Sequence, residues 1–251
     1  MNNLKFIVTG TGRCGTVFMA KLLTLIGIPC GHESIFDYKE TSVILEKLKN
    51  PELRSNSFCS THDISTNPSS SLKEWVETKY TIAESSYLAV PFLFHPEIVN
   101  IPLIHLVRHP LDVISSFVKD FKYFMNKCPN PKNPYNKKGW ENKIYNFLPE
   151  LEFIDNPVDR ACWFYIKWNN EIEKAAKFKK SVFVQIENVD YPKLFNFLEI
   201  KQSKKEIILN DREKNSNRKR DKNFEVRNIK SQTIRKLFIE KIDQYYGECN
   251  V

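Results

Sequence analysis

The chain has 251 residues, which suits one large α/β domain, and no shift in composition marks a boundary between two. Hydrophobic residues make up 41% of it and aromatic residues 13%, so it can form a packed core and is not a disordered chain. Its formal net charge of +8 favours anionic partners, but a lysine-rich solvated surface explains that total equally well. The charge therefore bears on function only where a local site also calls for an anion.

The six cysteines lie at positions 14, 30, 59, 128, 162 and 249 and form no CxxC pair, so we expect no metal site. The N-terminus enters a predicted core strand at once, which leaves no room for a signal peptide. No apolar run reaches membrane-spanning length. These features predict a cytoplasmic protein with reduced thiols and without a transmembrane segment.

A strand, a glycine-containing turn and a helix are predicted at the start of the chain. The strand begins at Phe6, the turn holds Gly10 and Gly15, and the helix continues to Ile26. This geometry directs backbone N–H groups and the positive end of a helix at an anion. The spacing of the two glycines is that of a P-loop, in which backbone amides close around a phosphate.

The turn departs from nucleoside triphosphatases where those enzymes bind phosphate and Mg²⁺. They would carry Lys at position 16 and Ser or Thr at position 17, whereas this chain has Thr16 and Val17, and its cation is Arg13. The turn therefore suits an oxyanion but not the lysine and Mg²⁺ arrangement of ATP hydrolysis.

A turn at 28–34 follows the first helix and places His32 next to Glu33. Both side chains come near the first turn if this segment leads into a neighbouring parallel strand. A later strand at 80–83 delivers Glu84 and the two serines after it to its carboxyl end. There they either contact a ligand or serve the turn itself.

The second strong strand is the apolar run at 103–107, which is typical of a sheet covered on both faces and buries His105 as a core residue. Pro110 suits the first turn of a helix after it, and Asp112 suits the positive end of that helix. Magnesium-dependent P-loop enzymes commonly place an aspartate at the end of such a strand, but this strand ends in Arg108. An arginine there favours a second phosphate or sulfate.

A segment at 121–157 is rich in Asn, Lys, Pro and aromatic residues. It is too apolar for a linker and too broken for a core element, so we interpret it as a lid or binding insertion. The stretch at 211–222 is strongly basic and lacks apolar residues, which is typical of a solvated charged loop.

The other elements follow from hydrophobic periodicity. They begin with a stretch at 37–57 that is helical and then loop-like, with Pro51 as a break, followed by a short strand at 58–64 with His62 and Asp63 near its end and a helix from Ser69. Further elements lie at 159–178 (helix), 181–186 (strand), 192–198 (helix) and 231–246 (helix). His62 and Asp63 are either an acid–base pair or an ordinary polar loop end. Alternating strands and helices predict a single domain over 1–251: a three-layer α/β fold, P-loop NTPase-like, with a mostly parallel sheet flanked by helices and its working groups at the strands' carboxyl ends.

Two motifs in this order resemble the sulfotransferases that use 3′-phosphoadenosine 5′-phosphosulfate (PAPS). They are the turn Gly10-Thr11-Gly12-Arg13-Cys14-Gly15-Thr16 and the run Val107-Arg108-His109-Pro110-Leu111-Asp112-Val113-Ile114-Ser115-Ser116-Phe117. The resemblance implies that the first turn holds the 5′-phosphosulfate through Gly12, Arg13, Cys14, Gly15, Thr16 and Val17. It also implies that Arg108 and Ser116 bind the 3′-phosphate. The family more often has Ser where Cys14 stands, and a backbone N–H contact would tolerate the change.

The resemblance further implies in-line, metal-independent transfer of a sulfuryl group from PAPS to a hydroxyl or amine, with 3′-phosphoadenosine 5′-phosphate as the product. Arg13 would stabilise the departing phosphate. Glu33 is the first candidate for the general base and His32 the second, because the tyrosine-sulfating branch has a stretch similar to the one that ends in these two residues. Alternatively, Glu33 merely caps the next helix. The basic residues Arg218, Lys219 and Arg220 would reach the 3′-phosphate if they match the family's late basic segment.

Two alternatives remain at this stage. A P-loop nucleotide or small-molecule kinase would need a lysine in the turn and a metal-binding carboxylate. A non-catalytic nucleotide- or polyanion-binding module would bind in a salt-sensitive way, without preference for a 3′-phosphate. For the enzyme we expect a small-molecule, carbohydrate or peptide acceptor and no nucleic-acid partner.

Overall fold

The computed structural model describes residues 4–37, 41–50, 53, 82–120, 124, 139–200 and 224–247. The strand expected at 58–64, the helix expected from Ser69, the first part of the 121–157 insertion and the basic stretch at 211–222 lie outside these residues. The strands are β1 (Phe6–Thr9), β2 (Cys30–His32), β3 (Ala83–Ser85), β4 (Leu103–Val107) and β5 (Ser181–Gln185). The helices are α1 (Thr16–Leu25), α2 (Thr41–Lys49), α4 (Pro110–Ser115), α5 (Gly139–Phe147), α6 (Pro157–Ala176), α7 (Tyr191–Phe197) and α8 (Gln232–Tyr246), with shorter turns η2 (Tyr87–Phe92), η3 (Ser116–Asp120), η4 (Pro149–Phe153) and η7 (Val226–Asn228).

The five strands form one parallel sheet in the order β2-β3-β1-β4-β5. The central strands β1 and β4 are apolar runs, as expected for a parallel sheet that is covered on both faces. Strand β4 pairs in register with β5 along its whole length, from Leu103 opposite Ser181 to Val107 opposite Gln185. The expected α/β class and the mainly parallel sheet are confirmed.

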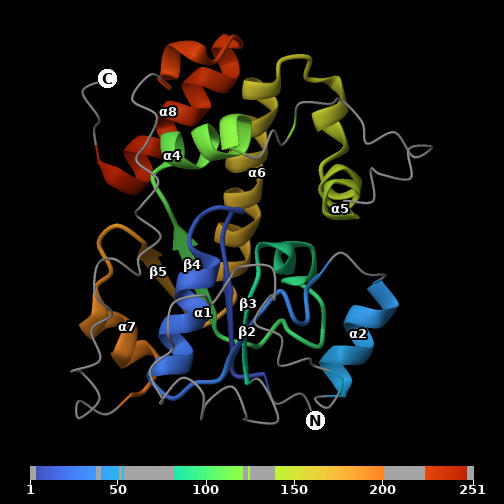
Figure 1. Cartoon of the computed structure of the whole chain (residues 1–251), viewed down its shortest axis with the longest axis vertical. Coiled ribbons are helices and arrows are strands. Elements are labelled where there is room, and N and C mark those ends of the chain that lie inside the picture. The colour runs from blue at the N-terminus through green and yellow to red at the C-terminus, as the bar shows by residue number, and fades with distance from the viewer. Residues whose placement is uncertain are drawn as a thin grey trace.

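Helices cover both faces of the sheet, so the fold has three layers (Figure 1). Alternate residues of β1 and β4 enter two separate hydrophobic cores. Val8 and Ile104 pack with α1 and α7 on one face, whereas Ile7 and Leu103 pack with α6 on the other. The long helix α6 is amphipathic and fully buries Trp168. The sheet is thus held from both sides.

The chain leaves β1 and β4 in opposite directions across the sheet. After β1 it passes through α1 to reach β2 on one side, and after β4 it passes through α6 to reach β5 on the other. Because β1 and β4 are neighbours, their outgoing loops lie at a topological switch point, the place where ligands of open α/β sheets bind. The two arginine-bearing motifs leave these two strands.

Two elements differ from the sequence prediction. The segment at 28–34 was expected to be a turn, but Cys30–His32 forms β2, a three-residue edge strand that pairs with β3. Strand β3 itself begins at Ala83, so Glu84 lies inside the strand and not after it. Both differences have one cause. Each segment is short and becomes a strand only through its pairing: β2 with β3, and β3 with both β2 and β1.

Among the described residues, no helix is both long enough and apolar enough to cross a bilayer. The described cysteines Cys14, Cys30 and Cys162 are buried free thiols. Burial raises the pKa of the Cys14 thiol to about 12, so it is not a thiolate at neutral pH. The described residues also contain no cluster of three or more His, Cys, Asp or Glu side chains that could hold a metal ion.

Candidate active site

The first turn is compact because two of its glycines lack a side chain where one would collide. A Cβ on Gly10 would lie 2.0 Å from the carbonyl oxygen of Leu106 in β4. Gly15 has a φ of +98°, and a Cβ there would lie 2.8 Å from Ile186. These close approaches bring the turn against the carboxyl ends of β4 and β5. Gly12 is less restricted, because its nearest neighbour would be a Phe117 ring carbon at 3.4 Å.

The turn ends at the N-terminus of α1, where the helix has no competing negative group. Gly15 is the N-cap and supplies no side-chain oxygen, and the first helical turn contains no acidic residue. The leading N–H groups, which include those of Thr16 and Val17, therefore have no partner within the helix. Together with the positive helix end they make this turn suitable for an anion.

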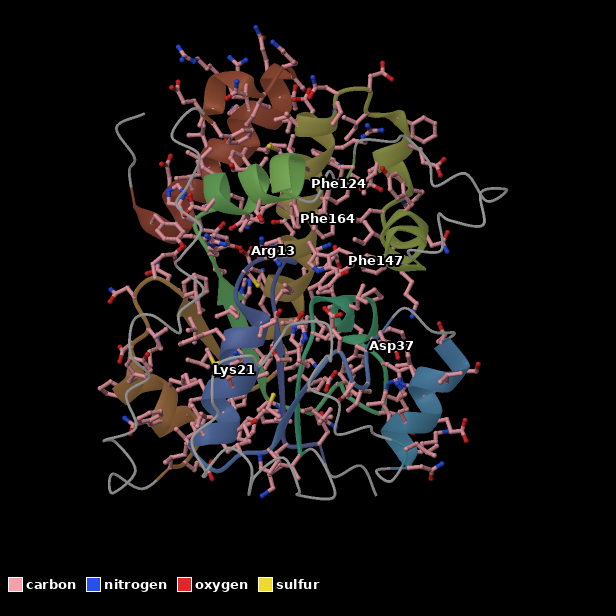
Figure 2. All side chains as sticks on the ribbon, in the orientation of Figure 1. Arg13, Lys21, Asp37, Phe124, Phe147 and Phe164 are labelled. Carbon is pink, nitrogen blue, oxygen red and sulfur yellow. The ribbon has the colours of Figure 1, made fainter. Side chains whose placement is uncertain are left out.

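Arg13 and the second motif lie together at the carboxyl end of the sheet. Arg108 Nη1 donates to the carbonyl oxygen of Arg13 at 3.2 Å, and Arg13 Nε donates to the hydroxyl of Ser116 at 3.2 Å. Ser116 is buried, while both arginines are partly exposed. Figure 2 shows Arg13 at the end of the sheet that faces α4. The structure thus brings together three residues that the sequence analysis assigned to one ligand.

Residues that the sequence analysis missed support the Arg108 loop. The phenol of Tyr165 in α6 donates to the carbonyl oxygen of Arg108 at 3.1 Å. Glu187 accepts from the backbone N–H of His109 at 2.7 Å and from the phenol of Tyr246 at 2.8 Å. These contacts join α6, α8 and the turn after β5, which are far apart in sequence, so no local pattern could have identified them.

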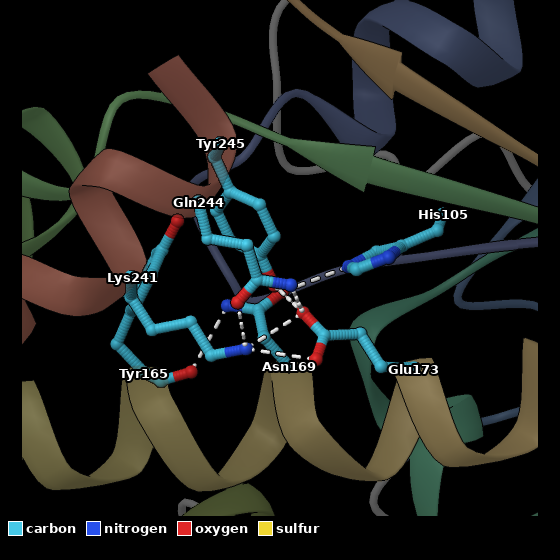
Figure 3. Close-up of polar contacts among 7 residues, drawn as sticks. All are labelled: His105, Tyr165, Asn169, Glu173, Lys241, Gln244 and Tyr245. Carbon is cyan, nitrogen blue, oxygen red and sulfur yellow. Dashed lines mark hydrogen bonds and ion pairs between the residues drawn. The ribbon is translucent and has the colours of Figure 1, made fainter. Parts of the chain in front are cut away.

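Helix α8 is itself held on α6 by a polar network (Figure 3). Glu173 of α6 accepts from Lys241 at 2.7 and 2.8 Å and from the phenol of Tyr245. Beside it, His105 of β4 shares a hydrogen bond of 2.9 Å with Asn169. Burial lowers the pKa of His105 to about 4, so this residue is a neutral core histidine, as the sequence predicts.

His32 and Glu33 follow at the end of β2, on the other side of the first turn. His32 Nε2 and the hydroxyl of Thr16 share a hydrogen bond of 3.0 Å, and Ser85 donates to the carbonyl oxygen of Thr16 at 2.8 Å. Glu33 Oε1 lies 4.0 Å from His32 Nε2. His32 is thus bonded directly to the first turn, and Glu33 adjoins it through His32.

Glu33 combines an unusual backbone with a perturbed acidity. Its φ of 55° lies in the left-handed region that non-glycine residues seldom adopt. Burial, and then the neighbouring Glu84 and Asp37, raise the pKa of the Glu33 carboxyl to about 7. Its side chain remains 31% exposed, so the carboxylate can still be reached. A carboxyl with these properties is suited to proton transfer near neutral pH.

Glu84 was expected at the end of its strand, but its carboxylate is fully buried. It accepts from the hydroxyl of Ser34 at 2.6 Å and from the backbone N–H of Ile35 at 2.9 Å. Glu84 therefore supports the turn after β2 and does not face a ligand. Burial raises the pKa of Glu84, and its hydrogen bonds oppose that shift.

The described part of the insertion, which is Phe124 and the residues from 139 onwards, packs against the core and also reaches the turn after β2. The Phe147 ring of α5 lies 5.5 Å from Trp168 of α6. From the same helix, Lys143 Nζ donates to the carbonyl oxygen of Asp37 at 2.8 Å. The insertion therefore borders the side of the site on which Glu33 lies.

The candidates His62, Asp63, Arg218, Lys219 and Arg220 lie outside the described residues. No family model matches the chain, and no curated protein or solved structure matches it either. What the site does must therefore be argued from its own geometry.

Proposed function

We propose that this protein is a sulfotransferase that moves a sulfuryl group from PAPS to a hydroxyl or amine of an acceptor. The observation that carries the proposal is the meeting of Arg13, Arg108 and Ser116 at the switch point between β1 and β4. A nucleotide with phosphate groups on both its 3′ and 5′ positions needs two anion sites within one molecule's length. Two arginine-bearing loops in direct contact meet that requirement.

The residues fit such a nucleotide in three respects. Gly10 lets the turn pack directly against β4, so the turn that carries Arg13 lies at the carboxyl end of the sheet. The start of α1 adds N–H groups and no acidic residue. Arg13 Nε already donates to the hydroxyl of Ser116, so a phosphate that enters between the motifs would take over that donor.

In the proposed reaction, the bond between the sulfur and the bridging phosphate oxygen breaks as the acceptor oxygen or nitrogen bonds to sulfur. The leaving phosphate gains negative charge, which Arg13 and the N–H groups of the turn would stabilise. The hydroxyl of Thr16 would donate to the same oxygens. The acceptor's proton passes to the carboxylate of Glu33, and 3′-phosphoadenosine 5′-phosphate is the product.

Glu33 is preferred to His32 as the general base. The Nε2 atom of His32 is engaged with the hydroxyl of Thr16, so its role is to orient that side chain. Glu33 is partly exposed, and its pKa of about 7 lets it be ionised in a large fraction of molecules at neutral pH while it still holds a proton effectively.

Calorimetry with 3′-phosphoadenosine 5′-phosphate and with ADP, each with and without Mg²⁺, tests the proposal. We expect the 3′-phosphorylated nucleotide to bind more tightly by at least about tenfold, without dependence on Mg²⁺. Preference for Mg²⁺-ATP would instead favour a kinase, and salt-sensitive binding without 3′-phosphate preference would favour a binding module. A panel of carbohydrate, peptide and small phenolic acceptors, assayed with labelled PAPS, would then identify the acceptor.

A further inference from the structure

Two elements hold the turn that carries Glu33. Glu84 of β3 accepts hydrogen bonds from the hydroxyl of Ser34 and from the N–H of Ile35. Lys47 of α2 donates to the carbonyl oxygen of Ser34 at 2.7 Å. The residue next to Glu33 is thus bonded through its hydroxyl and through its carbonyl, which restricts the left-handed backbone at Glu33 itself.

Lys47 occupies an unusual place for a lysine. It is only 7% exposed, and its Nζ atom forms an ion pair of 2.9 Å with the buried carboxylate of Asp37. Lysine is seldom buried to this degree without a partner. Lys49, on the same helix, is exposed. Because Lys47 is buried, its positive charge lies against Asp37 at the end of the turn.

The described charged groups around Glu33 come from every element packed on it. His32 adjoins it on β2, Glu84 lies beneath it on β3, and Asp37 ends the same turn. Lys47 of α2 and Lys143 of α5 both bind Asp37, the first through its carboxylate and the second through its carbonyl oxygen. Lys47 also lowers the pKa of Glu84. It is therefore the cation that offsets both carboxylates that act on Glu33.

We propose that Lys47 is a positioning residue for Glu33: it fixes the turn through the carbonyl oxygen of Ser34 and pairs with the carboxylate of Asp37 at the end of the same turn. Its assignment to catalysis rests on the proposed function, but its effect on Glu33 does not. No pattern in the sequence marks Lys47, because α2 meets the turn only through tertiary contact.

The test is an NMR titration of the Glu33 carboxyl carbon in the full-length protein. Lys47→Met should raise the Glu33 midpoint by about 0.5–1 pH unit, because Asp37 and Glu84 lose their counter-ion. Asp37→Asn should lower it by a similar amount, because a negative neighbour is removed. Lys49→Met, which removes the same charge from the exposed face of α2, should leave it unchanged.

Opposite shifts of the Glu33 midpoint in Lys47→Met and Asp37→Asn would show that Lys47 acts on Glu33. A merely structural role for Lys47 would not give shifts of opposite sign. If Lys47→Met does not fold, Lys47→Arg (which keeps the charge), Asp37→Asn and the double variant still allow the comparison. Lys47→Arg should retain the wild-type midpoint, and the double variant Lys47→Met/Asp37→Asn should titrate above Asp37→Asn, because Glu84 has lost its counter-ion in it. Shifts of the same sign in Lys47→Met and Asp37→Asn, or an unchanged midpoint in Asp37→Asn, would overturn the inference. Absence of transfer from PAPS, with the midpoints moving as described, would count against the proposed function alone.

Discussion

Two residues of this site, Arg13 and Glu33, have backbone conformations that are unfavourable for non-glycine residues, and Glu33 also has a raised pKa. Arg13 and Glu33 both have a positive φ, of 69° and 55°, although neither is glycine. Each costs on the order of 1 kcal/mol or more in backbone energy. The surrounding contacts keep them there: Arg108 binds the carbonyl oxygen of Arg13, and the N–H of Glu33 donates to that of Ser85. Strained backbone of this kind persists only where the surrounding structure holds it in place.

Glu33→Gln should slow turnover and stabilise the protein above pH 7. In the folded state the pKa of Glu33 is raised to about 7, so its ionisation disfavours folding as the pH rises from about 4.5 to 7. Glutamine avoids this cost, and we expect a gain of about 1–2 kcal/mol at pH 8, less than the full shift because the group is partly exposed. Urea unfolding at pH 8 and pH 4.5 measures the gain, which should vanish at the lower pH.

The corresponding kcat for a verified acceptor should fall by at least about 100-fold in Glu33→Gln. Full turnover in this variant would remove Glu33 from the base position, whatever its effect on stability. A stabilisation that is equal at pH 8 and pH 4.5 would show that the charge of Glu33 is not its cause.

The sequence identifies some of these residues and not others, for a physical reason. Arg13, Arg108 and Ser116 belong to local patterns, each directly attached to a strand end, and the parallel sheet brings strand ends together. Glu187 acts on His109, which lies 78 positions away in the chain, and Lys47 reaches Ser34 only because α2 folds back onto the turn that precedes it. A lysine in an amphipathic helix normally faces water, so only the fold shows that Lys47 does not.

At the scale of elements, the decisive contact is between the first turn and β4. The apolar runs at β1 and β4 made both strands predictable, and their parallel pairing follows from the helices between them. Strand β2 was not predictable, since it has three residues and one of them, Gly31, disfavours strands. The start of α6 was misplaced by two residues because Asn156, not a later residue, is its N-cap.

Gly10→Ala should destabilise the protein by about 3 kcal/mol, since the added Cβ would meet the backbone of β4 at 2.0 Å and backbone cannot easily move away. Gly12→Ala is the matched control in the same turn, and its nearest contact is a ring carbon at 3.4 Å, so the cost should be below about 1 kcal/mol. Chemical denaturation of the two variants measures the difference. Equal costs would mean that the turn is not held against β4 as described.

Across the whole molecule, buried ionisable groups respond to pH in opposite directions. Between about pH 4.5 and 7 the folded protein binds more protons at Glu33 than the unfolded chain does, so this carboxyl favours folding as the pH falls. His105 does the reverse, because burial lowers its pKa to about 4 while the unfolded residue takes up a proton near pH 6.5. The two effects partly cancel in mildly acidic solution.

The destabilisation caused by His105→Gln should therefore depend on pH. It should be largest at pH 7, where the hydrogen bond between His105 and Asn169 is intact, and should shrink by about 3 kcal/mol by pH 4, because the wild-type protein has lost that much. Denaturation curves for the two proteins from pH 4 to pH 7 provide the comparison. A difference that stays constant with pH would mean that His105 is protonated equally easily in the folded and unfolded states.

The net charge of +8 does not by itself select a ligand, and the proposed function rests on the meeting of two arginine-bearing loops. The most direct test is the affinity ratio between 3′-phosphoadenosine 5′-phosphate and 5′-AMP, measured by calorimetry for the wild type, for Arg108→Ala and for the surface control Arg227→Ala. We expect the wild type and the control to prefer the 3′-phosphorylated nucleotide by about 100-fold. Arg108→Ala should reduce that ratio to near one; it also releases the carbonyl oxygen of Arg13, so the affinity for 5′-AMP should fall too, but by less than that for the 3′-phosphorylated nucleotide. A ratio near one in the wild type, or an undiminished ratio in Arg108→Ala, would contradict the account.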